Sequence, residues 1–258
     1  RLEPLPRPTL GELFSAARDG GEGADEPGGA DRVAMLSGRI ELEEGGILFD
    51  WSKTHLDRAV VAGFEELAEA MDFAGMRAKL FGGEVVNPTE GRAADHATLR
   101  GTGEGARVEE AMALIDRMGM LVEAIHQGAL GEIEHLIHIG IGGSALGPAL
   151  GVDALGRDLS YCDVHVVSNI DGVALEAAFA KCDPAKTLIA VASKTFTTIE
   201  TMTNAASALK WLGDNGVSDP GGRVIALTAN PEGAVEWGVD ETRILPFQES
   251  VGGRYSIW

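Results

Sequence analysis

Short apolar runs alternate with helix-like stretches throughout the second half of the chain. The apolar runs are residues 136–139, 164–167, 187–192, 224–227 and 243–245. The helix-like stretches between them are residues 145–155, 173–180, 199–212 and 232–237. Nearly continuous apolar strands are typical of a parallel sheet covered on both faces, and strand–helix alternation is typical of doubly wound domains. We therefore predict an α/β domain at residues 107–258, a three-layer αβα sandwich around a mainly parallel sheet.

The first 106 residues lack this alternation and are predicted to form a largely helical extension. A short helix is expected at residues 9–18, with Thr9 as its N-cap. Residues 19–31 are rich in Gly, Asp and Glu, a composition typical of an exposed loop.

Three further elements of the extension and its junction follow from residue periodicity. Residues 39–51 alternate around a Gly-Gly pair, which predicts a small hairpin. Apolar residues recur with a period near 3.6 over residues 55–81, which predicts helical structure there. A second apolar stripe over residues 108–125 predicts a long helix that leads into the α/β domain.

Charge limits what the chain can bind. Asp and Glu number 40 against 21 Lys and Arg, a formal net charge of −19. This sign is opposite to the one that binds nucleic acid or anionic membranes. No apolar run approaches the roughly 20 residues that span a bilayer, and residues 1–9 lack the apolar segment of a secretory signal. We expect neither a nucleic-acid nor a membrane partner.

Cysteine and histidine usage predicts a reducing compartment and no metal ion. Two cysteines, Cys162 and Cys182, are too few for a disulfide framework or a cysteine-rich zinc site. We interpret them as core thiols in a cytosolic protein. The histidines share no metal-ligand spacing along the chain, and we interpret His135 and His138 as structural.

The first candidate ligand site is the glycine-rich segment at residues 140–148. It follows a predicted strand, and a helix should begin at about Ser144. Glycines let backbone N–H groups approach an anion, and a helix N-terminus adds partial positive charge. A tight turn without a ligand explains the segment equally well. The P-loop pattern is absent, but Asp171 after the next strand keeps a dinucleotide site as a weak rival.

The second candidate is residues 193–198, Ser-Lys-Thr-Phe-Thr-Thr, which we call the hydroxyl turn. It contains four hydroxyls and one ammonium between a predicted strand and a predicted helix. Helix capping needs one such hydroxyl rather than four. We therefore favour an anion site, formed by hydroxyls and helix-start amides. Both candidates follow strands, at the sheet edge where open α/β domains bind ligands.

Four segments, taken together, resemble the glucose-6-phosphate isomerase family. They are residues 138–148 (HIGIGGSALGP), 167–172 (VSNIDG), 192–201 (ASKTFTTIET) and 251–258 (VGGRYSIW). Residues 50–53 and 87–100 are also similar to family segments, so the resemblance extends from about residue 48 to the last residue. It implies two sugar-isomerase (SIS-type) α/β domains, of which this chain contains the first, a cytoplasmic homodimer, no cofactor and a sugar-phosphate substrate. The implied reaction interconverts glucose 6-phosphate and fructose 6-phosphate.

The resemblance also implies roles for individual residues. Ser193, Thr195, Thr198 and Thr201 match phosphate-binding positions, with Lys194 beside them. The backbone of Gly143 and the side chain of Ser144 match groups that contact phosphate and sugar. Arg254 matches the arginine that stabilises an enediolate-like intermediate; from its own context, it is equally well a surface residue in a salt bridge.

Two departures from the family pattern affect these expectations. The position after Ser144 is often acidic in the family, and here it is Ala145. The chain stops at Trp258, and the resemblance places a catalytic Glu, a ring-opening His and a late Lys beyond this point. We therefore expect this chain to supply the phosphate anchor and Arg254 but to be inactive alone. The alternative is a non-catalytic SIS-type module that binds a sugar phosphate.

Overall fold

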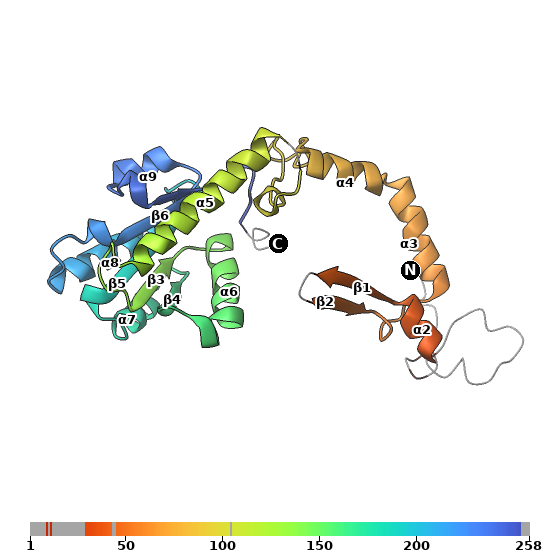
Figure 1. The fold of residues 1–258 in the computed structure, drawn as a ribbon, viewed down its shortest axis with the longest axis horizontal. Coiled ribbons are helices and arrows are strands. Elements are labelled where there is room, and N and C mark those ends of the chain that lie inside the picture. The colour runs from red at the N-terminus through yellow and green to blue at the C-terminus, as the bar shows by residue number, and fades with distance from the viewer. Residues whose placement is uncertain (1–8, 10, 12–28, 43–44, 104, 254–258) are drawn as a thin grey trace, which may run out of the picture. The chain divides into compact units, whose positions relative to one another are not determined.

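The computed structural model describes residues 9, 11, 29–42, 45–103 and 105–253 (Figure 1). By its internal contacts the chain divides into two compact units, Arg1–Met76 and Arg77–Trp258. Helix α5 (Ala106–His126) begins where the predicted α/β domain begins, and residues 77–105 join it in the second unit. The predicted helix at residues 9–18 lies mainly outside the described residues, as do residues 19–28 of the predicted acidic loop.

The first unit contains the predicted hairpin. Strands β1 (Ser37–Leu42) and β2 (Gly45–Asp50) pair antiparallel, with Ser37 opposite Asp50. Helix α2 (Gly29–Met35) precedes them, so the last three residues of the predicted loop are helical. The buried Arg32 of α2 donates hydrogen bonds to the backbone oxygens of Ser52 and Thr54, at 2.9 and 2.7 Å. These bonds tie α2 to the segment after the hairpin.

The helical structure predicted over residues 55–81 is confirmed for most of this range, and it consists of two helices. Helix α3 (Arg58–Ala70) ends before Asp72, and helix α4 (Phe73–Gly82) follows it. Asp72 has a φ of +50°, in the left-handed region where a helix cannot continue. Its carboxylate accepts a hydrogen bond from the Gly75 backbone N–H at 3.2 Å, so it caps the first turn of α4.

The second unit is built on a five-stranded parallel sheet, as predicted. Its strands lie in the order β4-β3-β5-β6-β7, with every neighbouring pair parallel. Their bounds are β3 (His135–Ile139), β4 (Asp163–Val167), β5 (Thr187–Ala192), β6 (Val224–Thr228) and β7 (Ile244–Pro246). After β3, the next strand in sequence, β4, pairs with one side of β3, and β5 then pairs with the other side of β3. The strand order therefore reverses direction between β3 and β5.

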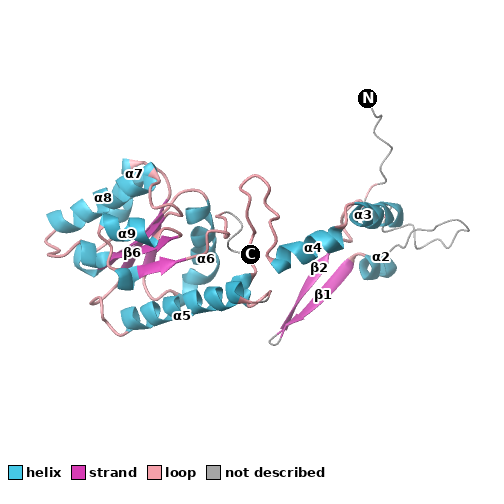
Figure 2. Cartoon of the chain, turned by 90° about the horizontal axis from the view of Figure 1, so that it is seen from above, coloured by secondary structure: helices cyan, strands magenta, loops and turns pink. Residues whose placement is uncertain are grey.

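Helices cover both faces of this sheet, which confirms the three-layer arrangement (Figures 1 and 2). One face packs on α7 (Gly172–Phe179), α8 (Ile199–Asp214) and α9 (Pro231–Trp237). The opposite face carries α5 and α6 (Gly143–Leu159). Single 3₁₀ turns η1 to η4 complete the unit, at Thr98–Arg100, Pro184–Lys186, Gly221–Arg223 and Glu241–Arg243.

The burial of the strands explains why each of them is a nearly continuous apolar run in the sequence. All six residues of β5 are buried, because both faces of this central strand are covered. Ile137 and Ile189 point to the α8 face, where they pack with Leu212. Leu188 and Ile225 point to the other face, toward Ile125 of α5. Burial at these positions supplies roughly 25 cal/mol per Å² of apolar surface removed from water.

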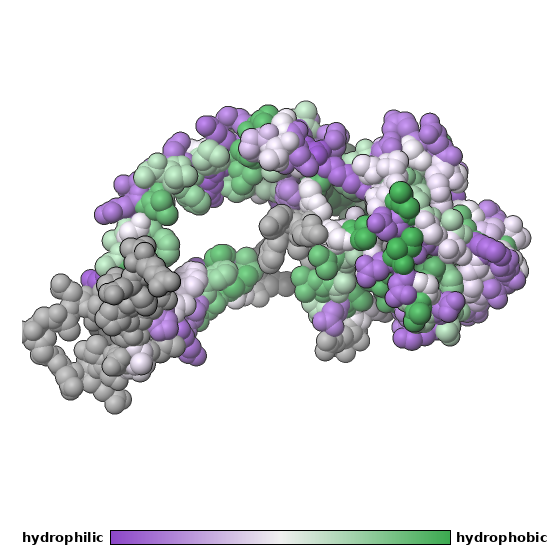
Figure 3. All heavy atoms as spheres, turned by 180° about the vertical axis from the view of Figure 1, so that it is seen from behind, coloured by the Kyte–Doolittle hydropathy of each residue, from purple (hydrophilic) through white to green (hydrophobic). Residues whose placement is uncertain are grey.

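The surface is mixed in character. Figure 3 shows polar residues interspersed with apolar patches on the visible face. Leu146, Leu150 and Leu155 of α6 are among the exposed apolar side chains. Across the described ranges, no helix has both the length and the apolar content that a bilayer crossing requires.

Candidate functional site

The two predicted ligand turns emerge side by side from the sheet. Ile139 at the end of β3 pairs with Val191 near the end of β5. Neighbouring strands lie about 4.8 Å apart, so the segments that follow them start close together. This is also where the strand order reverses, which is the place where open α/β sheets bind ligands.

The glycine turn, residues 140–143, is shaped by close backbone approach. A Cβ atom on Gly140 would lie 2.5 Å from the backbone oxygen of Ser144, so only glycine fits. Gly142 has a φ of +58° and is the N-cap of α6, which begins at Gly143. The turn therefore brings backbone amides and the Ser144 side chain to a helix N-terminus.

His138, in β3, is hydrogen-bonded to the first turn of α6. Its Nε2–H donates a hydrogen bond of 2.7 Å to the backbone oxygen of Ser144. Burial lowers the pKa of His138, and the bond to Ser144 acts in the opposite direction. The ring is thus held neutral as a donor. The sequence interpretation of His138 as structural missed this link to Ser144.

The hydroxyl turn is held by its own side chains. The hydroxyls of Ser193 and Thr198 lie 3.1 Å apart, and Ser193 Oγ also accepts a bond from the Phe196 backbone N–H. Phe196 has a φ of +56°, and its buried ring packs edge-to-face on Trp237, with ring centroids 5.9 Å apart. Strain of this kind persists only where the surrounding packing imposes it.

The backbone of the hydroxyl turn is also bonded to the end of β6. The Lys194 oxygen accepts hydrogen bonds from the Ala229 N–H at 3.0 Å and the Thr228 hydroxyl at 3.1 Å. The Asn230 side-chain amide donates to the Thr195 oxygen at 2.9 Å. Burial, followed by the charge of Arg92, lowers the pKa of Lys194. A second cation therefore acts on the lysine of this turn.

The N-terminus of α8 retains hydrogen-bonding capacity. Thr198 is its N-cap, but the Thr198 side chain makes no capping hydrogen bond. Thr201 in the first turn is 2% exposed, and its buried hydroxyl has no hydrogen-bond partner. Such groups are normally satisfied, so this helix start is a place where an acceptor would be stabilised.

A cavity of about 240 Å³ joins the two turns. Gly143 and Ser144 from the glycine turn and α6 line it together with Lys194 from the hydroxyl turn. The other lining residues are Leu99, His138, Pro148, Ala192, Leu227, Phe247, Val251, Gly252 and Gly253. The structure thus brings three of the predicted site residues into one cavity.

Four of the other predicted residues do not line the cavity. Ser193, Thr195, Thr198 and Thr201, all among the described residues, are not part of the cavity lining. Thr195 is exposed, and its hydroxyl accepts a bond from the Thr197 hydroxyl at 2.8 Å. Arg254 lies outside the described residues.

Residues 251–253, which line the cavity, belong to a segment that is bonded to residues 92–98, before α5. The sequence motifs did not assign residues 92–98 to the site. The Gly252 backbone N–H donates to His96 Nε2 at 2.9 Å, and the Thr98 hydroxyl donates to Gln248 at 3.1 Å. Arg92 forms an ion pair of 2.7 Å with Glu249. These contacts join residues about 150 positions apart in sequence, and only the family-like segment at residues 87–100 hinted at them.

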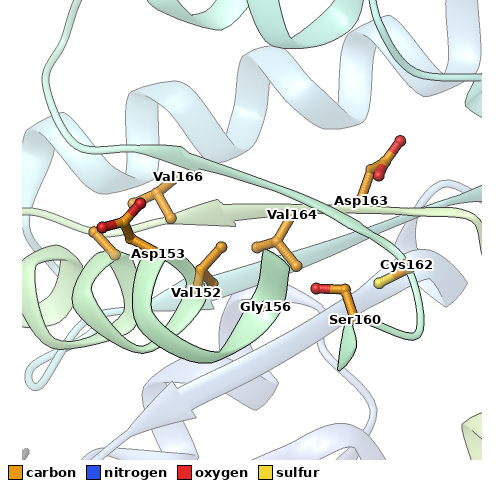
Figure 4. Close-up of a pocket in the computed structure, with 9 residues that line it drawn as sticks. Val152, Asp153, Gly156, Ser160, Cys162, Asp163, Val164 and Val166 are labelled. Carbon is orange, nitrogen blue, oxygen red and sulfur yellow. The ribbon is translucent and has the colours of Figure 1, made fainter. Parts of the chain in front are cut away.

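A larger cavity, of about 600 Å³, lies between α6 and β4 (Figure 4). It is lined by Asp153 and Asp163 but by no Lys or Arg among the described residues. Its charge therefore disfavours an anion.

Asp171, which the dinucleotide hypothesis assigned to a ribose, accepts a hydrogen bond from the Val173 N–H at 2.9 Å as the N-cap of α7.

The second unit is thus a doubly wound α/β domain with a cavity at its switch point, the place where open α/β sheets bind ligands. A family profile described as phosphoglucose isomerase matches residues 50–258. The chain therefore belongs to the phosphoglucose isomerase family.

The relatives agree with this assignment. The chain is 69% identical to glucose-6-phosphate isomerase of Erythrobacter litoralis over 97% of its length, and 65% identical to that of Novosphingobium aromaticivorans over its whole length. It spans 48% of each of these relatives. A crystal structure of a glucose-6-phosphate isomerase from Chlamydia trachomatis superposes with a TM-score of 0.68 at 24% identity, over 88% of this chain and 45% of the other. That likeness confirms the SIS-type fold.

Proposed function

We propose that the whole protein interconverts glucose 6-phosphate and fructose 6-phosphate, and that this chain supplies the anchor for the phosphoryl group. The observation that carries the proposal is the shared cavity of Gly143, Ser144 and Lys194 at the switch point of the sheet. Membership of the phosphoglucose isomerase family supplies the reaction.

The anchor would act by positioning. The Ser144 hydroxyl, the Gly143 amide and the Lys194 ammonium would hold the phosphoryl oxygens, because charge-assisted hydrogen bonds are the strong ones. Ser193, Thr195, Thr198 and Thr201 do not line the cavity, and we propose them as further phosphate contacts that form when their hydroxyls rotate; those of Ser193 and Thr198 lie 3.1 Å apart. A sugar fixed by its phosphate presents C1 and C2 in a constant place, and binding energy lowers the barrier in this way.

The chemical step needs a base and a ring-opening acid, which this chain is not proposed to contribute. Isomerisation moves a proton between C2 and C1 through an enediol, so a carboxylate base must lie within hydrogen-bond reach of the carbon acid. Arg254 is proposed to stabilise the oxyanion that develops. The base and the ring-opening acid are assigned to the part of the relatives that this chain does not span.

The test is binding and turnover with paired lysine variants of the full-length protein. Lys194→Met removes the cation that lines the cavity, whereas Lys210→Met removes an exposed lysine paired with Asp214 on α8. Losing one charged hydrogen bond costs roughly 1.5–3 kcal/mol, which is about 10- to 150-fold in the KM for fructose 6-phosphate. The Lys210 variant should keep the wild-type KM.

The same assay separates the alternatives. Turnover with equal KM in both variants would contradict the anchor assignment. Tight binding of fructose 6-phosphate without any turnover by the full-length protein would favour a non-catalytic sugar-phosphate module. We also propose a cytoplasmic homodimer, supported by family membership; sedimentation of the full-length protein as a monomer would oppose the dimer.

A further inference from the structure

A cluster of three side chains that can bind a metal ion lies near the amino ends of the strands, at the end of the sheet opposite to the cavity that Gly143, Ser144 and Lys194 line. His135 is the first residue of β3, His165 lies in β4, and Cys182 is in the connection between α7 and β5. One potential ligand atom from each, a ring nitrogen or the sulfur, lies within 4.8 Å of the other two. All three side chains are half-buried.

The register of the parallel strands creates this cluster. His135 pairs with Asp163, and Ile137 pairs with His165. His165 is therefore two residues along from the partner of His135, and side chains two apart share a face. That face is covered by α7, whose C-terminal end leads to Cys182. Separations of 30 and 17 residues in sequence hide this arrangement, which is why spacing along the chain predicted no metal ion.

The cluster leaves buried nitrogen atoms unsatisfied. His135 Nδ1 and His165 Nε2 are both buried without a hydrogen-bond partner. Buried polar atoms are almost always paired, since losing water without a replacement bond costs free energy. Two such atoms on residues that cluster with a thiol are an independent sign that a ligand belongs among them.

The donor set selects the class of ligand. Two imidazoles and one thiolate suit a borderline-soft divalent ion such as Zn²⁺, which binds four ligands tetrahedrally. Zinc bonds of about 2.0–2.3 Å place ligand atoms about 3.3–3.8 Å apart, so small side-chain rotations close the cluster onto an ion. Asp163 is the candidate for the fourth ligand, because its Oδ2 lies 4.0 Å from His135 Nδ1 and its side chain is 81% exposed.

We propose that His135, His165 and Cys182 form a binding site for a zinc-like divalent metal ion, with Asp163 or water as the fourth ligand. The ion would join β3, β4 and the α7–β5 connection at the amino ends of the strands. The sugar-phosphate cavity lies at the carboxyl ends, so the ion would stabilise the domain without taking part in isomerisation.

Cobalt(II) is the probe for this site, because a tetrahedral cobalt–thiolate bond absorbs light where free Co²⁺ does not. The full-length protein, stripped with chelator and reduced, is titrated with CoCl₂ alone. We expect a thiolate-to-cobalt band that saturates at one equivalent in the wild type and is lost in Cys182→Ser. The matched control is Cys162→Ser, because Cys162 lines the cavity between α6 and β4 and lies outside the cluster (Figure 4).

A second variant protects the test against a folding defect. His165→Gln keeps the thiol but removes one ligand, and it should weaken cobalt binding at least tenfold while circular dichroism of the metal-free protein stays unchanged. Zn²⁺ should displace the cobalt band and raise the melting temperature of the wild type and Cys162→Ser only. Absence of the band in the wild type, or an equal band in Cys182→Ser, would overturn the proposal.

Discussion

Gly140 offers a sharp test of how the glycine turn shapes the site. An added Cβ would lie 2.5 Å from the Ser144 backbone oxygen, whereas Cβ contacts shorter than 3.0 Å are essentially never found in proteins. In Gly140→Ala the first turn of α6 must therefore move by roughly 1 Å, and overpacking of this size costs about 1–3 kcal/mol of folding free energy. The shift moves Ser144, and a displacement of about 1 Å in a positioning group can cost 100-fold in rate.

Gly151 is the matched control for this substitution. It lies in the same helix, and an added Cβ would meet no atom within 4 Å. Gly151→Ala should raise stability by about 0.5–1 kcal/mol through helix propensity and leave the KM unchanged. Both variants are compared by urea unfolding and by turnover of fructose 6-phosphate. Wild-type KM and kcat in Gly140→Ala would refute the argument that this turn places Ser144.

Three further outcomes follow from the second unit. Phe196→Ala should lower the free energy of unfolding by about 3–5 kcal/mol, because a buried ring is lost while the strained φ is kept; a urea midpoint equal to that of the wild type would contradict this. Burial lowers the pKa of His138 below its ordinary 6.5, so the unfolded chain takes up the proton first. Stability should therefore fall as pH drops below about 6.5 and level off below the folded pKa, and unfolding curves for His138→Gln should lack this component. The 258-residue chain alone should show no turnover in a coupled isomerase assay, and a rate comparable to that of a full-length relative would disprove the division of labour proposed above.

The sheet could be predicted from sequence because its physical cause is local. Each strand is an apolar run covered on both faces, as at β5, so composition alone identifies it. The break between α3 and α4 could not be predicted, because Asp72 has no Gly or Pro beside it that would indicate the end of a helix. A left-handed aspartate that caps the next helix leaves no signal in the apolar period.

The candidate site, like the fold, could be predicted from the sequence only in part. Glycine and hydroxyl patterns identified Gly143, Ser144 and Lys194, which line the cavity. Leu99 lies in a family-like segment to which no role was given, and Phe247 carries no motif; both reach the cavity through contacts between distant segments. The hydroxyl pattern alone also did not show that Ser193 and Thr198 bond to each other, because a rotamer choice depends on the folded turn.

The most direct test is a crystal structure of the full-length protein with fructose 6-phosphate bound. The account predicts the phosphoryl oxygens about 2.7–3.2 Å from donors of Ser144 and Lys194, with the sugar directed toward residues 251–254. A phosphoryl group bound in the cavity between α6 and β4, or elsewhere away from the glycine and hydroxyl turns, would contradict it.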